Sequence, residues 1–144
     1  MWNNETIARA SEQIVGFGRF IEWCGGWPWF HDAEVVRLEL NREGQSRLVL
    51  RVLGDSRPAF GPRANPKFSI PGEDVTVTFI LDGVEDLELS SFNHQNVIFD
   101  LLLQQNDEMF RITLEPCFGL AGTIDARTIQ LEFQPSDSHS QLIL

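Results

Sequence analysis

The sequence has no tyrosine, only two cysteines and no long apolar segment. Cys24 and Cys117 lie far apart without CxxC-type spacing, so we expect two buried thiols in a reducing compartment. The most apolar run, Val97–Leu103, is interrupted by Asp100 and is far shorter than the roughly 20 residues that span a bilayer. Met1 is followed at once by Trp2, Asn3, Asn4 and Glu5, which do not resemble a signal peptide, so we expect a cytoplasmic protein.

Basic side chains are scarce relative to acidic ones. Lys and Arg together number 11 and Asp and Glu 21, which gives a formal net charge of −10. Residues 68–126 carry 11 acidic side chains and 1 basic one, whereas residues 42–67 carry 6 basic and 2 acidic. A negative field repels nucleic acid and anionic membranes, so neither is expected as a partner, and it attracts a basic protein.

Motifs for nucleophilic or phosphate chemistry are also missing. The sequence has no GxSxG elbow, and neither cysteine stands in an electropositive segment. Gly16-Phe17-Gly18 lacks the remainder of a dinucleotide fingerprint. We therefore expect a protein that is not an enzyme and that holds no cofactor or metal.

Hydrophobic residues make up 42% of the 144 positions, enough for one core, and their spacing changes along the chain. Helical spacing near the N-terminus is interrupted at Gly16, and a second helical piece, Arg19–Cys24, ends at Gly25-Gly26. From Glu34 onward the period is two, which predicts antiparallel strands.

The first predicted hairpin has Val36, Leu38 and Leu40 on its buried face, turns at residues 41–45 and returns through 47–52. A second hairpin is expected from 75–79 and 87–89, turning at Asp82-Gly83. Three further strands are predicted at residues 96–104, 108–115 and 128–133, and the first two meet at Asn106-Asp107. The fold class is therefore α+β, with an N-terminal helical segment packed on a mainly antiparallel sheet of six to seven strands.

Two segments lie outside this pattern. Residues 54–72 contain four prolines and predict a long mobile connector, with a lid or a binding loop as the alternatives. The polar residues 135–144 predict a flexible C-terminal tail. Residues 1–134 are expected to form a single domain.

The strand alternation also predicts an acidic surface. If Leu87 and Leu89 point inward, their acidic neighbours point outward, and Asp100 leaves a strand whose Phe99, Leu101 and Leu103 are buried. Only Arg111 opposes these charges, so a partner is a reasonable explanation for them. The predicted partner-binding residues are Asp82, Glu85, Asp86, Glu88, Asp100 and Glu115.

Two clusters combine aromatic and polar side chains. The first spans residues 27–34 and the second residues 90–96; their candidate residues, structural or binding, are Trp27, Phe30, His31, Asp32, Glu34, Asn93, His94 and Asn96. Neighbouring side chains on a strand point to opposite faces, so His31 and Asp32 could hardly bind one ion there. The structural interpretation is that the aromatic residues close the core while His31 and Asp32 bond backbone groups. If His94 lay near His31, the pair would form a small-ligand or metal site.

The run GWPWFHDAEV at residues 26–35 resembles the WPxFHDAEV signature of the immunity protein 50 family. The stretch LELSSFNHQNV at residues 87–97 is similar to a second motif of those proteins, whereas Trp29 stands where a small polar residue is expected. The resemblance implies a cytoplasmic bacterial protein that neutralises a polymorphic toxin by binding it, and it carries no catalytic residues.

Three hypotheses follow. The leading one is a non-enzymatic immunity protein, monomeric or homodimeric, that occludes a toxin domain with its acidic surface. The second is a small ligand- or metal-binding domain centred on His31 and His94. The third is an enzyme of unrecognised type that uses the same residues.

Overall fold

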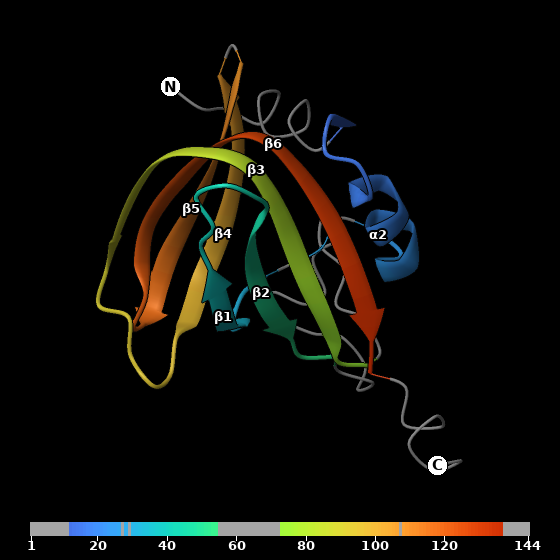
Figure 1. The fold of residues 1–144 in the computed structure, drawn as a ribbon. Coiled ribbons are helices and arrows are strands. Elements are labelled where there is room, and N and C mark those ends of the chain that lie inside the picture. The colour runs from blue at the N-terminus through green and yellow to red at the C-terminus, as the bar shows by residue number, and fades with distance from the viewer. Residues whose placement is uncertain (1–11, 27, 29, 55–72, 107, 137–144) are drawn as a thin grey trace.

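The structure is a computed structural model that describes residues 12–26, 28, 30–54, 73–106 and 108–136. Its strands form a closed barrel in the order β1-β2-β3-β6-β5-β4, and all neighbouring strands are antiparallel (Figure 1). The prediction of a helical segment with a mainly antiparallel sheet is confirmed in this coarse form. The elements are α2 (Phe17–Cys24), β1 (Glu34–Glu39), β2 (Ser46–Val52), β3 (Val75–Ser90), β4 (Val97–Asn106), β5 (Met109–Phe118) and β6 (Ala121–Pro135).

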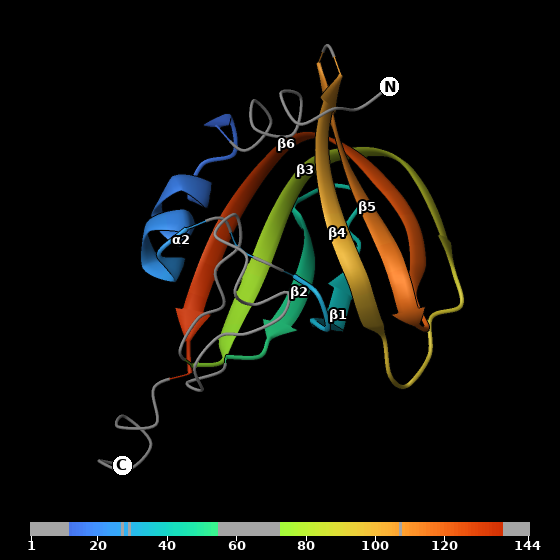
Figure 2. The same ribbon diagram turned by 180° about the vertical axis from the view of Figure 1, so that it is seen from behind.

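Helix α2 packs against β6, beside which it lies in both views (Figure 1, Figure 2). The Phe20 ring lies 5.1 Å from the Phe133 ring of β6, measured between centroids. Gly25, with φ 83°, ends the helix. The N–H groups of Gly25 and Gly26 both donate to the carbonyl of Ile21. The predicted stop at Gly25-Gly26 is therefore confirmed.

The β1–β2 hairpin forms as predicted, but its buried face differs from the predicted one. A bulge between Val35 and Arg37 adds a residue to β1, so the alternation shifts by one position. Val35 is 2% exposed, whereas Val36 is 51% and Leu40 48% exposed. The prediction that Val36 and Leu40 are buried is wrong.

The predicted second hairpin is also wrong. Strand β3 continues through Asp82-Gly83 to Ser90 and pairs with β6 from end to end, so that the two strands arch together over one end of the barrel (Figure 1). Gly83 has φ 65°, and a bulge lies between Val84 and Asp86. Glycine and the bulge bend the strand rather than reverse it, because the ladder with β6 outweighs the local turn signal.

The barrel interior holds the hydrophobic core. Phe79 and Ile112 are fully buried, and Phe30 connects this interior to the helix, its ring centroid lying 6.2 Å from those of both Phe20 and Phe79. Fully burying such a side chain stabilises the fold by about 1.5–3 kcal/mol. Phe99, expected inside, is 54% exposed because bulges at the start of β4 turn it outward.

The two cysteines differ in their surroundings. Cys24 is buried in the core, and burial raises the pKa of its thiol to about 11. The thiol is therefore protonated and unreactive at neutral pH. Cys117 is exposed, which contradicts the expectation of two buried thiols.

Several sequence predictions fall outside the described residues. These are the helical spacing before residue 12, most of the proline-containing loop 54–72, and the tail beyond residue 136. No helix in the described part of the chain has the length and apolar character needed to cross a membrane.

Candidate functional site

Four neighbouring strands present carboxylates on their outer surface. Asp86 on β3 lies opposite Asp125 on β6, and Asp125 lies opposite Arg111 on β5. Residues directly opposite share a sheet face, and the intervening Ile112 and Ile124 are buried, so this row points outward. We define the acidic face as the outward side chains of Asp86, Glu88, Asp100, Arg111, Glu115 and Asp125.

The Arg111 guanidinium is held at the centre of the acidic face by Asp125. Its Nε and Nη2 atoms donate to the two carboxylate oxygens at 2.7 and 3.0 Å. This pairing raises the pKa of Arg111, and the nearby charges of Asp86 and Glu88 raise it further. Arg111 is thus neutralised mainly by Asp125, and the other carboxylates are left in excess.

Sequence reasoning missed Asp125. The last strand was expected to begin at Thr128, which left Asp125 in a connection, whereas β6 begins at Ala121. The signal that could have found it is the alternation of Ile124 and Ala126 around it. Both neighbours are buried.

Asp100 and Glu115 lie directly opposite each other on β4 and β5, and both are half-buried. Burial raises the pKa of Asp100, while a hydrogen bond from the Leu101 N–H, at 2.8 Å, and the charge of nearby His31 lower it in part. Like charges in this position destabilise a sheet. Among the described residues, neither Glu115 nor the Asp86–Glu88 pair on β3 forms an ion pair.

The other two predicted carboxylates lie apart from this row, at the bend of β3. Asp82 accepts a hydrogen bond from the Gln45 side chain at 3.2 Å. Glu85 forms an ion pair with Arg127 of β6. The structure therefore brings four of the six predicted residues together and engages Asp82 and Glu85 in contacts within the chain.

Residues 30–33 of the first motif form a turn whose backbone hydrogen-bonds to β4. The Ala33 N–H donates to the Phe30 carbonyl at 3.0 Å, and Asp32, the third residue of the turn, has φ 68°. A positive φ at this position alone defines a type II turn. The Asp32 N–H donates to the Ile98 carbonyl at 3.0 Å, and the Ile98 N–H donates to the Ala33 carbonyl at 2.9 Å. These bonds close the barrel between β1 and β4.

The polar side chains of this motif lie beside the same junction. The His31 Nδ1 is 3.4 Å from an Asp32 carboxylate oxygen, and the His31 ring centroid is 4.9 Å from that of Phe99. Glu34 lies opposite Val97 of β4. The side chain of Trp27 lies outside the described residues.

The second motif supplies the other side of the junction. Asn96 is 3% exposed, and its carbonyl accepts the Val35 N–H at 2.8 Å. Its side-chain oxygen accepts the N–H groups of Asn93 and Leu120 at 2.9 and 3.0 Å, and its amide donates to the Asn93 carbonyl at 2.8 Å. Two motifs far apart in the sequence thus meet where the barrel closes.

His94, the remaining member of the second motif, is exposed and bonds the side chain of Asn93. In the described part of the chain, no group of three or more His, Cys, Asp and Glu side chains is arranged to hold a metal ion. The geometry therefore offers no observation in favour of a metal site around His31 and His94.

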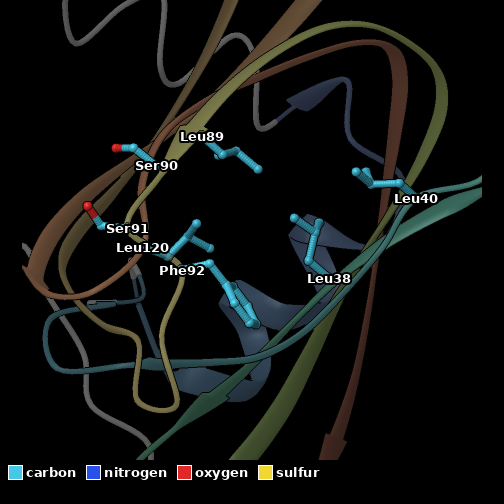
Figure 3. A pocket seen from close by; sticks show the side chains of 7 residues that line it. All are labelled: Leu38, Leu40, Leu89, Ser90, Ser91, Phe92 and Leu120. Atoms are coloured by element: carbon cyan, nitrogen blue, oxygen red, sulfur yellow. The ribbon is translucent and has the colours of Figure 1, made fainter.

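A pocket of about 370 Å³ opens near the β1–β2 turn. The apolar side chains of Leu38, Leu89, Phe92 and Leu120 converge on it, whereas the serine hydroxyls point away (Figure 3). We name it the mouth pocket. Its lining residues are Leu38, Leu40, Leu89, Ser90, Ser91, Phe92 and Leu120.

Comparison with known proteins identifies the family. Neither the curated proteins nor the solved structures gave a match. A family model described as Immunity protein 50 matches residues 19–134, a span that begins within α2, ends in β6 and includes both motifs and the acidic face. The chain therefore belongs to the Immunity protein 50 family.

Proposed function

We propose that this protein binds and neutralises a bacterial toxin by covering a basic surface of the toxin with its acidic face, without catalysing a reaction. Family membership supports an immunity protein whose partner is a protein. The observation that carries the proposal is the excess of carboxylates on four adjacent strands, where Arg111 is the one Lys or Arg side chain among the described residues of that face.

The charge arrangement suits a basic partner. Since Asp125 neutralises Arg111, the charges of Asp86, Glu88 and the Asp100–Glu115 pair remain available. Such a surface accelerates encounter with a basic protein, and it disfavours acidic partners. Asp100 and Glu115 lie directly opposite each other, so one basic side chain of the partner can approach both carboxylates.

Three residues of the two motifs have a different role in this proposal. Phe30, Asp32 and Asn96 are engaged in the core or in the β1–β4 junction. We propose that they hold the barrel closed and that the toxin contacts the sheet instead.

The test requires the cognate toxin domain, which is sought among the proteins encoded beside this gene. Affinity is measured for the wild type, for Asp86→Lys/Glu88→Lys, and for the control Glu132→Lys, which reverses an exposed charge near the other end of β6. We expect the double variant to bind at least about tenfold more weakly and to lose protection of toxin-expressing cells, with a smaller effect at high salt. Unchanged affinity and protection in the double variant would refute the proposal.

A further inference from the structure

The barrel is least continuous between β1 and β4. These strands pair at a single position, Glu34 with Val97, because β4 begins there and runs in the opposite direction. Beyond this position, the backbone of 36–39 pairs only with β2 within the described residues. Strand β1 therefore has a free edge, and a free edge is a template on which another chain can add a strand.

The mouth pocket lies beside this free edge. Leu38 of β1 and Leu40, which follows the strand, form one wall, and Leu89 and Phe92 form another. Leu40 is 48% and Phe92 64% exposed, so these apolar side chains face solvent in the free protein. Covering apolar surface stabilises a complex by about 25 cal/mol per Å² of area removed from water.

The mouth pocket is also continuous with the acidic face. Leu89 and Ser90 line it, and Glu88 precedes them on the same strand with its carboxylate on the acidic face. A partner that covers the acidic face along β3 therefore reaches the mouth pocket at the end of that strand.

We propose that an extended segment of the toxin pairs with the free edge of β1 and places one apolar side chain in the mouth pocket, with basic residues beside it. This inference rests on the proposed function. Strand pairing supplies affinity, and the pocket selects the side chain. A buried apolar anchor of this kind dominates the energy of many protein interfaces.

Two other occupants fit less well. A polar small molecule needs several convergent polar groups. Among the described lining residues, Ser90 and Ser91 alone are polar, and their hydroxyls point away (Figure 3). A second copy of this chain would bring Glu88 and its neighbours close to an identical acidic surface, and like charges facing each other oppose association.

The test compares Leu40→Ala/Phe92→Ala with the control Leu53→Ala. Leu53 is 54% exposed and follows the opposite end of β2, so the control removes a similarly exposed leucine away from the mouth pocket. With the same cognate toxin domain, we expect the double variant to bind about tenfold or more weakly and the control to bind like the wild type. Amide exchange at 36–39 should slow in the complex.

The outcomes separate this inference from the proposed function. Normal binding by Leu40→Ala/Phe92→Ala, or unchanged exchange at 36–39, overturns the inference even where Asp86→Lys/Glu88→Lys weakens binding. A wild-type dimer in sedimentation that is lost in the pocket variant, with toxin affinity unchanged, shows that a second copy occupies the site and also overturns it. Absence of wild-type binding overturns both proposals.

Discussion

Asp100 is an acidic side chain whose surroundings oppose its charge. It is half-buried, lies opposite Glu115, and has a pKa raised by burial. In Asp100→Asn the side-chain oxygen can still accept the Leu101 N–H, which lies 2.8 Å away in the wild type. The substitution therefore removes the charge and preserves the hydrogen bond.

These contacts set the expected gain in the free energy of unfolding of Asp100→Asn. Like charges directly opposite on antiparallel strands cost about 0.2–1 kcal/mol, and the burial of Asp100 adds to the cost of its ionised form. We expect Asp100→Asn to raise the free energy of unfolding at pH 7 by about 0.5–1 kcal/mol and the Tm by about 2–4 °C. If Asp100 contacts the toxin, the same variant binds it a few-fold more weakly.

The gain depends on pH with a definite sign. Because the pKa of Asp100 is raised on folding, the folded state holds the proton more tightly than the unfolded state. Ionised Asp100 therefore destabilises the wild type above its raised pKa, and this cost disappears below the ordinary value of about 3.9. The difference in the free energy of unfolding between Asp100→Asn and the wild type is therefore largest at neutral pH and decreases as the pH falls.

Urea denaturation of Asp100→Asn, Glu115→Gln and the double variant forms the assay. Both single substitutions relieve the same repulsion, so the double variant should gain less than the sum of the two. A lower free energy of unfolding in Asp100→Asn at pH 7 would refute the reasoning. So would a double variant whose gain equals the sum of the two single gains. Higher stability with unchanged toxin affinity would remove Asp100 from the proposed interface.

Two further substitutions test the fold around the site. Asn96→Ala should lower the free energy of unfolding by about 2–3 kcal/mol, because it removes three hydrogen bonds and leaves the buried Leu120 N–H unpaired. Urea denaturation measures this change, with Asn106→Ala at an exposed position as the control. Asp74→Asn should cost under about 1 kcal/mol at pH 7, since the Gly54 N–H lowers the pKa of Asp74. That difference should shrink as the pH falls from about 4 through the lowered pKa, and an equal difference at pH 7 and pH 3 would contradict it.

Local patterns in the sequence predicted the parts of the fold that depend on neighbouring residues. The helix stop at Gly25, the β1–β2 hairpin and the β4–β5 hairpin all follow from periodicity and turn residues close in the chain. The pairing of β3 with β6 could not be predicted in this way. Its ladder joins Val75 to Pro135, and no local signal specifies so distant a pairing. Bulges were missed for a related reason: one extra residue changes the exposure of Val36 without changing the alternation read from the sequence.

The same distinction applies to the candidate site. The outward direction of Glu115 follows from alternation, since Leu114 beside it is buried. The same reasoning was wrong about the neighbours of Asp86, Glu88 and Asp100, because Leu87 and Phe99, expected inside, are 37% and 54% exposed. The neutralisation of Arg111 by Asp125 and the meeting of the two motifs at the barrel junction depend on pairings between distant strands. Sequence reasoning could therefore propose the surface but not its internal ion pair.

The positions of the two motifs in the structure indicate which part of the protein the family resemblance describes. The residues that carry it include Phe30, Asp32 and Asn96, whose contacts lie in the core and at the β1–β4 junction. The acidic face is built mainly by other residues, on strands that this junction holds in place, whereas Leu89–Phe92 of the second motif also line the mouth pocket. A chain that keeps the junction can vary the acidic face without losing the barrel. We therefore expect the motifs to identify the fold, and the charges of the acidic face to determine which toxin is bound.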